Sequence, residues 1–277
     1  MSAHCSFRIG GPADLFIEPG SEAELIEILR FLREAGEKPV IIGKGTNLLV
    51  RDEGVRAPVV HVGEALGGVS ARGETLAAGA GESLSRIAAA ARDAGLSGFV
   101  FAHGIPGSLG GAVEMNAGAY GGEMKDVVAS VRWLDETGAL RETADAGFSY
   151  RRSRFSDGEG VILSAALRLT PGDPAEIAAR MHELWERRSS SQPLSKPSAG
   201  STFKRPATGY AAAMIDGAGL KGFRLGGAQV SEKHAGFVIN TGGATCADVL
   251  ALMAHIQEAV EREYGVLLEP EVRIIGG

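Results

Sequence analysis

Glycine is gathered into short clusters along this chain, and these clusters restrict what it can fold into. Gly accounts for 40 of the 277 residues, about twice the usual share of roughly 7%. The clusters are GKGTN, AAGAGE, GIPGSLGGA, NAGAYGG, GLKGFRLGG and NTGG. No fixed period links them, which excludes collagen-like and solenoid repeats. Glycine clusters beside apolar runs indicate backbone that closely approaches something bulky.

Charge and segment composition exclude several classes of protein. The net charge of −6 and the pI of about 5.6 argue against a general nucleic-acid binder, which would carry a basic face. The first ten residues lack the pattern of a signal peptide, and no run of 18 apolar residues is present. Cys5 and Cys246 match no metal-binding spacing. We therefore expect a reduced cytoplasmic protein without membrane insertion and without a metal site. We also expect a monomer, although nothing in the composition determines the oligomeric state.

The hydrophobic pattern predicts a strand-rich first part and a smaller α+β second part, divided near residues 170–173. A capping box at Ser21–Glu24 predicts a helix to about Ala35, and Gly95 is placed to end a helix over 83–94. Strands are expected at 13–18, 38–43, 59–63, 74–81 and 160–170, with a hairpin formed by 127–134 and the following LRET. Beyond the boundary, helices are expected at 173–188, 208–216 and 245–263, and strands near 225–230, 236–240 and 267–275.

Two of the glycine clusters follow buried strands and are candidates for a phosphate site. In IIGKGTNLLVRD (41–52), a Gly-x-Gly turn can aim backbone N–H groups at a pyrophosphate. The third glycine and the following helix of a Rossmann fingerprint are missing, so this segment alone favours a plain turn over a phosphate cradle. The second cluster, FAHGIPGSLGGAVEMNAGAYGG (101–122), is either a packing turn or an anion site. Two such loops in one domain favour a single large diphosphate ligand such as a flavin dinucleotide.

Seven blocks in order carry a family resemblance: RIGGPAD, GKGTNLL, GIPGSLGGA–MNAGAYG, SYRRSRF, SAGSTFK, GGAQVSEKHAGFVIN and LEPEVRIIG. Together they resemble the UDP-N-acetylenolpyruvoylglucosamine reductase family, from about Phe7 to Gly276. The resemblance implies an α+β chain with a two-subdomain FAD-binding fold of the vanillyl-alcohol-oxidase-like type. It places that domain at 1–171, with subdomains at about 1–55 and 56–171, and a substrate domain at 172–277 whose last strand packs back near the flavin. The shorter family type, without an extra substrate-covering loop, is implied.

The same resemblance implies an NADPH-dependent flavoenzyme with non-covalent FAD. It would reduce the enolpyruvyl group of UDP-N-acetyl-3-O-(1-carboxyvinyl)glucosamine to UDP-N-acetylmuramate for peptidoglycan synthesis, with NADPH and the UDP-sugar sharing one site. The catalytic residues carried over are Arg151, Ser201 as proton donor, and Glu271. Without the resemblance, these residues read as a solvated basic turn, a loop serine and an exposed strand charge.

The resemblance also assigns binding residues. Lys204, Lys221 and His234 are expected to contact the substrate. The expected FAD contacts are Gly43, Lys44, Gly45, Thr46, Asn47, Leu48, Gly79, Pro106, Gly107, Ser108, Gly110, Gly111, Ala112 and Asn116. Arg205 and Ser191 replace residues common in relatives, which affects the expected uridine and pyrophosphate contacts. The alternatives are another FAD-dependent oxidoreductase on the same scaffold and a non-catalytic nucleotide-sugar binding module.

Overall fold

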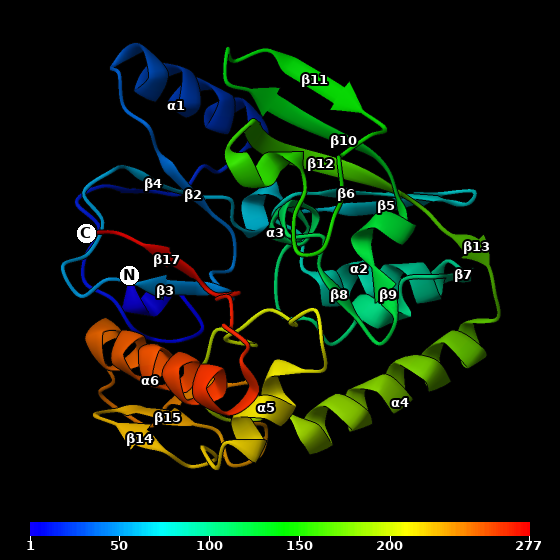
Figure 1. Ribbon diagram of the computed structural model, residues 1–277. Helices are drawn as coiled ribbons and strands as arrows, with labels where there is room; N and C mark the ends of the chain where they lie inside the picture. Colours follow the sequence, from blue (N-terminus) through cyan, green and yellow to red (C-terminus); the bar gives the residue numbers. More distant parts are fainter. The chain divides into compact units, whose positions relative to one another are not determined.

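The computed structural model describes all residues from Met1 to Gly277 (Figure 1). The chain forms two compact units, each built from segments distant in sequence. Unit 1 comprises residues 1–15, 45–57 and 189–277, and unit 2 comprises residues 16–44 and 58–188. No helix is both long enough and apolar enough to cross a membrane.

Unit 2 begins with a small parallel sheet in the order β1-β4-β2. Its strands are β1 (Phe16–Ile17), β2 (Val40–Ile42) and β4 (Val59–His61), and α1 (Glu22–Glu34) lies between β1 and β2 in sequence. The Ser21 hydroxyl accepts a hydrogen bond from the backbone N–H of Glu24, so the predicted N-cap is confirmed. Because β2 pairs in parallel with β4 and ends at Ile42, the Gly43–Lys44 turn leaves the sheet at the carboxyl end of a parallel strand.

An antiparallel sheet in the order β11-β10-β12-β6-β5 forms the centre of unit 2 (Figure 1). Helices α2 and α3 contact this sheet, and their buried side chains share one apolar cluster with those of the sheet. The predicted hairpin is confirmed, because Trp133 of β10 pairs with Arg141 of β11. The elements are β5 (Val69–Arg72), β6 (Thr75–Gly79), β10 (Val128–Asp135), β11 (Leu140–Thr143), β12 (Gly160–Arg168), α2 (Leu84–Asp93) and α3 (Leu109–Glu114).

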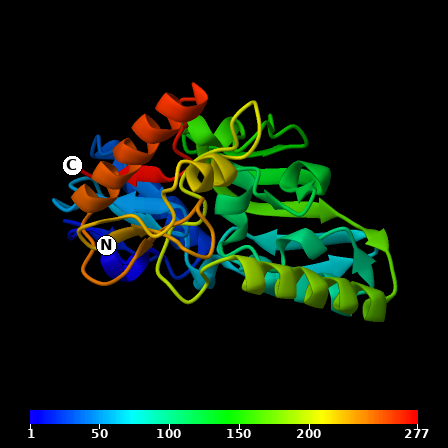
Figure 2. The same ribbon diagram turned by 60° about the horizontal axis from the view of Figure 1, so that its bottom comes forward.

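Shorter elements complete unit 2. Strands β7 (Leu96–Ser97) and β13 (Thr170–Pro171) pair, and α4 (Pro174–Ser191) follows β13 as one unbroken helix (Figure 2). Strands β8 (Gly118–Ala119) and β9 (Gly122–Glu123) form a tight hairpin with Tyr120 and Gly121 at its tip. The 3-10 turns of this unit are η2 (Glu64–Leu66), η3 (Val100–Ala102), η4 (Met124–Asp126) and η5 (Arg154–Asp157).

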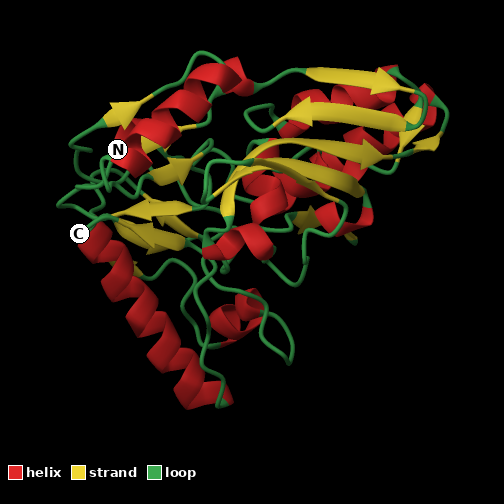
Figure 3. Ribbon diagram, turned by 90° about the horizontal axis from the view of Figure 1, so that it is seen from above, coloured by secondary structure: helices red, strands yellow, loops and turns green.

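Unit 1 joins the N-terminal segment, residues 45–57 and the C-terminal part of the chain. A three-stranded antiparallel sheet packs against α6 (Cys246–Tyr264), which also contacts α5 (Ala211–Gly217). Its strands are β14 (Arg224–Leu225), β15 (Ala228–Val230) and β16 (Val238–Asn240); η1 (Ser2–His4) opens the chain. Figure 3 shows both helices and strands, and the main sheets are antiparallel, which agrees with the predicted α+β class.

The predicted boundary at 171/172 does not match this division. Strand β17 (Arg273–Ile275) pairs in parallel with β3 (Leu48–Val50), so the last strand does pack back on the segment that follows GKGTN. The Asp52 carboxylate also accepts hydrogen bonds from the backbone N–H groups of Cys246 and Ala247 at the start of α6. These long-range contacts place residues 45–57 in unit 1, while α4 up to Arg188 groups with unit 2.

Candidate functional site

The two predicted phosphate loops meet within unit 2. A Cβ atom built on Gly43 would lie 2.3 Å from the Ser108 Oγ, so the first loop reaches the second with no room for a side chain. Ser108 is buried and precedes α3, and Gly107 has a φ of +155°. The loop pair therefore presents backbone from both glycine clusters at one place, which is the arrangement that a diphosphate ligand requires.

Of the two adjacent glycines in α3, Gly111 has open space where a side chain would lie. A Cβ atom on Gly111 would find only the Ser108 Oγ, at 4.0 Å, whereas one on Gly110 would lie 3.1 Å from the Ala80 Cβ. Gly110 is thus required by packing of the chain on itself. The open space beside Gly111 fits a bound group, so the residues present are compatible with FAD.

Several other predicted cofactor-binding residues make contacts within the protein itself. Ala112 is buried in the apolar core, and Lys44 pairs with the exposed Glu64 at 3.6 Å. The side-chain amide of Asn116 is fully buried and donates to Glu123 Oε2 and to the Ser149 carbonyl, while its oxygen accepts from the Lys125 N–H. Both Asn116 donors are used within the chain, so a flavin contact from Asn116 must come from its backbone. Pro106 is exposed.

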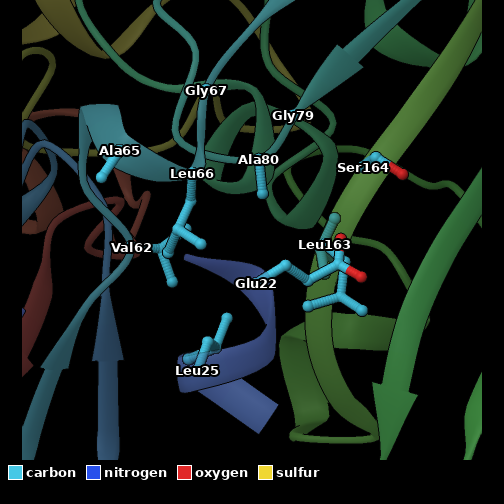
Figure 4. A pocket seen from close by; sticks show the side chains of 11 residues that line it. Glu22, Leu25, Val62, Ala65, Leu66, Gly67, Gly79, Ala80, Leu163 and Ser164 are labelled. Atoms are coloured by element: carbon cyan, nitrogen blue, oxygen red, sulfur yellow. The ribbon is translucent and has the colours of Figure 1, made fainter. Parts of the chain in front are cut away.

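A cavity of about 150 Å³ lies beside Gly79 in unit 2 (Figure 4). Its apolar walls come from α1, η2, β12 and the segment after β4, and Glu22 and Ser164 also line it. The apolar residues are Leu25, Val62, Leu66, Ile162 and Leu163. The pairing of β10 with β12 shifts register between Arg132 and Trp133, opposite this cavity wall. Such irregularities are frequent beside binding sites.

The second half of the first loop belongs to unit 1. Gly45 has a φ of +61°, and a Cβ atom on it would lie 2.3 Å from the His4 carbonyl oxygen. Glycine is therefore required at 45 by the chain itself, and a bulky residue there would disturb the fold before it disturbed a ligand. The Asn47 amide donates to the Glu271 carbonyl at 3.0 Å, and the Asn47 carbonyl accepts from the Arg273 N–H at 2.9 Å. These hydrogen bonds hold the loop that contains Thr46 and Leu48 beside Glu271, the predicted catalytic residue.

Arg151 lies at the tip of a tight turn in unit 2. The turn is closed by two backbone hydrogen bonds between Ser149 and Arg152, and Arg151 has a φ of +55°. Its guanidinium lies over the Tyr150 ring, 5.2 Å from the centroid, and donates to the Gly118 carbonyl at 3.4 Å. A non-glycine residue in this backbone conformation is uncommon and is often found at functional sites.

Ser201 and Glu271 lie on adjoining segments of unit 1. The Lys204 N–H donates to the Glu269 carbonyl, and the Glu271 N–H donates to the Thr202 carbonyl at 2.9 Å, so the SAGSTFK and LEPEVR blocks run side by side. Both Ser201 and Glu271 are half-buried. The Ser201 hydroxyl caps no helix, because the next helix begins at Ala211. The helix-cap explanation for this serine is therefore excluded.

The three predicted substrate contacts also lie in unit 1. The Lys204 ammonium pairs with Glu269, and the Lys221 ammonium pairs with Asp216 at 2.7 Å. The His234 Nδ1 accepts from the Gly236 N–H, which leaves the Nε2–H as the donor of the neutral ring. Burial lowers the pKa of His234 from its usual value, and the nearby charge of Lys221 lowers it further.

Thr202 joins the Ser201 segment to the loop that contains His234, since the Thr202 N–H donates to the Gly236 carbonyl at 2.8 Å. Thr202 therefore contacts both the Glu271 segment and the loop that contains His234. Arg205, where the chain departs from its relatives, stacks on the Tyr210 ring at 4.1 Å. Ser191 is the last residue of α4. No group of three or more His, Cys, Asp or Glu side chains is arranged to hold a metal ion.

The sequence interpretation missed Tyr120 and Arg188 in unit 2. Arg188 is only 8% exposed, and its guanidinium lies over the Tyr120 ring, 5.8 Å from the centroid. Burial lowers the pKa of Arg188, while a hydrogen bond with the Tyr120 side chain favours its charged form. A signal was present in the sequence: Ile177, Met181, Leu184 and Arg188 recur at helical spacing, which places Arg188 on the buried stripe of α4.

Comparison with known proteins agrees with this geometry. Residues 13–144 match a family model described as an FAD binding domain, and residues 192–275 match the C-terminal domain of UDP-N-acetylenolpyruvoylglucosamine reductase. The chain is thus of the class that joins an FAD-binding domain to a second, C-terminal domain.

Relatives identify the family. The chain is 50% identical to the UDP-N-acetylenolpyruvoylglucosamine reductase of Caldanaerobacter subterraneus subsp. tengcongensis, over all of this chain and 92% of that protein. It is 46% identical to that of Syntrophomonas wolfei, over all of this chain and 93% of that protein. The crystal structure of the Thermus caldophilus enzyme superposes with a TM-score of 0.84 at 35% identity, covering 99% of this chain and 96% of that one. The chain belongs to the UDP-N-acetylenolpyruvoylglucosamine reductase family.

Proposed function

We propose that this chain is an NADPH-dependent flavoenzyme that reduces the enolpyruvyl group of UDP-N-acetyl-3-O-(1-carboxyvinyl)glucosamine to UDP-N-acetylmuramate for peptidoglycan synthesis. The observation that carries the proposal is the antiparallel contact between the Ser201 and Glu271 segments of unit 1. It brings together two residues that lie 70 positions apart in sequence and that the family resemblance assigns to one reaction centre. A binding module without catalysis has no need of this pairing.

The cofactor of this proposal is non-covalent FAD. In unit 2 it would be held by backbone at Gly43, Gly107 and Gly111, where close approach or open space replaces a side chain. Gly79 and its cavity supply an apolar surface for part of the same cofactor. FAD supplies a hydride acceptor for NADPH and a hydride donor for the enolpyruvyl double bond.

Each catalytic side chain has a distinct task. Arg151 is permanently charged and can make two parallel N–H contacts, so it stabilises the negative charge that develops on the substrate carboxylate after hydride arrives. Glu271 assists as a hydrogen-bonding group at that carboxylate. The Ser201 hydroxyl donates the proton that completes reduction of the double bond; a positioned proton donor typically contributes about 10²–10⁴-fold.

The two substrate phosphates need local cations, because the chain as a whole is acidic. Lys221 and the Nε2–H of His234 lie in the part of unit 1 that contains the Ser201 segment, and Lys204 is three residues from Ser201. NADPH uses the same site as the UDP-sugar, since the chain has no separate Rossmann fingerprint. We further propose that the protein acts as a monomer in the cytoplasm.

The visible spectrum of the purified protein tests the proposal. We expect a yellow protein whose flavin absorbance is bleached anaerobically by NADPH and restored by the enolpyruvyl substrate. A flavoprotein whose reduced flavin is reoxidised by oxygen but not by that substrate would indicate another oxidoreductase. A protein that binds UDP-sugar but takes up no FAD would indicate a binding module.

A further inference from the structure

Tyr120 and Arg188 form a buried contact that none of the proposed catalytic or binding roles explains. Burying an arginine is costly and is found where its position matters. Here the Arg188 guanidinium lies over the Tyr120 ring, 5.8 Å from its centroid, and the guanidinium of the exposed neighbour Arg187 lies over the same ring at 5.2 Å. The Gly104 backbone packs on the arginine stem so closely that a Cβ atom there would lie 2.9 Å from the Arg188 Cδ. The stem of Arg188 is therefore packed closely against the Gly104 backbone.

Tyr120 is held in an uncommon backbone conformation at the tip of the β8–β9 hairpin. Its φ is +53°, and the other two non-glycine residues of unit 2 with positive φ are Asn116, just before the hairpin, and Arg151. Such conformations persist only where the surroundings impose them. All three in unit 2 belong to one connected set of contacts.

That set leads from Arg188 to the proposed catalytic arginine. The buried Arg188 packs on the Tyr120 ring, and Tyr120 is two residues beyond Gly118 in the hairpin. The Gly118 carbonyl in turn accepts from the Arg151 guanidinium at 3.4 Å. Asn116 holds the other side of the same turn through the Ser149 carbonyl at 3.0 Å. A small shift of the hairpin would thus move the acceptor that orients Arg151.

We propose that Tyr120 and Arg188 are positioning residues for Arg151: they fix the β8–β9 hairpin, which presents the Gly118 carbonyl to the Arg151 guanidinium. The inference rests on the proposed role of Arg151. It predicts that the pair affects the rate at which substrate is reduced and leaves reduction of the flavin by NADPH unchanged, because charge develops on the substrate only in the second step.

The test is a double-mutant cycle in the full-length holoenzyme with Arg188→Met, Arg151→Ala and both together. Reoxidation of NADPH-reduced flavin by saturating enolpyruvyl substrate is followed by stopped-flow absorbance. We expect Arg188→Met to slow it by about tenfold, with normal FAD content and normal reduction by NADPH. In the Arg151→Ala background the same change should slow it by less than about twofold, because residues that act as a unit are not additive. Arg180→Met, an exposed arginine of the same helix, is the matched control and should match the wild type.

Different failures are distinguishable. If the two losses multiply in the double variant, Arg188 acts independently of Arg151 and the positioning role is overturned. If Arg151→Ala reoxidises at the wild-type rate, the catalytic assignment itself is wrong, whatever Arg188→Met does. Should Arg188→Met fail to retain FAD, Tyr120→Phe removes only the hydroxyl that bonds Arg188 and enters the same cycle. The proposal would be overturned if Tyr120→Phe and Arg188→Lys each reoxidised at the wild-type rate.

Discussion

Gly111→Ala should move protein stability and FAD affinity in opposite directions. Gly111 lies within α3, where replacing Gly by Ala is worth roughly 0.5–1 kcal/mol to a helix. The new Cβ atom meets nothing closer than the Ser108 Oγ at 4.0 Å, so the apoprotein gains this stability without a clash. For a protein of this size, the gain raises the unfolding temperature of the apoprotein by roughly 1–4 °C. In the holoenzyme the same methyl group occupies space proposed for the cofactor.

Overpacking of a filled site costs about 1–3 kcal/mol, which corresponds to FAD binding weakened about 5- to 150-fold. Differential scanning of the apoprotein and fluorescence titration with FAD measure the two effects separately. Gly110→Ala is the control, because its Cβ atom would press on the Ala80 Cβ at 3.1 Å and should cost apoprotein stability. Unchanged FAD affinity in Gly111→Ala would refute the placement of the cofactor beside α3.

Three further outcomes are expected. Arg151→Ala should leave FAD bound and reducible by NADPH but slow reoxidation by the enolpyruvyl substrate at least about 10²-fold, whereas Arg152→Ala, whose partner Asp157 is exposed, should not; equal losses would argue against the assignment. The pKa of His234 is lowered in the folded protein from its usual value of 6.5. As pH falls, the unfolded chain therefore binds a proton at this histidine before the folded chain does. The free energy of unfolding should consequently fall as pH drops below about 6.5 and should be unaffected above it. Urea titrations at pH 5.5 and 7.5 should show a smaller drop for His234→Gln, and an equal drop would assign the effect elsewhere. Burial raises the pKa of the Cys246 thiol to about 11, so native protein at pH 8 should be alkylated there far more slowly than urea-unfolded protein, and equal rates would contradict the burial.

Local signals in the sequence predicted most individual elements. The capping serine at Ser21 marks the start of α1 and the glycine at Gly95 marks the end of α2 as expected, because each acts within a few residues of the chain. The division into units was not predicted. It depends on the pairing of β3 with β17, whose partners Leu48 and Arg273 are far apart in sequence, and no local pattern encodes such a pairing.

The residues of the candidate site also differ in how well the sequence alone could predict them. Arg151, Ser201 and Glu271 were found through the family resemblance, because their own residue types and neighbours read as ordinary turns and edge charges. Asn116 was expected to contact the cofactor, yet its amide is used inside the protein, which only the tertiary contacts reveal. Gly45 illustrates the converse: the glycine was expected for the sake of a ligand and is already required by the approach of His4.

The proton-donor role of Ser201 is the central claim, and the Ser201→Ala holoenzyme tests it most directly. Its hydroxyl caps no helix, so the substitution should change the unfolding free energy little. Stopped-flow absorbance of the flavin measures the two half-reactions separately. The account predicts wild-type reduction by NADPH and reoxidation by the enolpyruvyl substrate slowed by roughly 10²-fold or more, because the developing carbanion lacks its acid. Reoxidation at the wild-type rate would contradict the account.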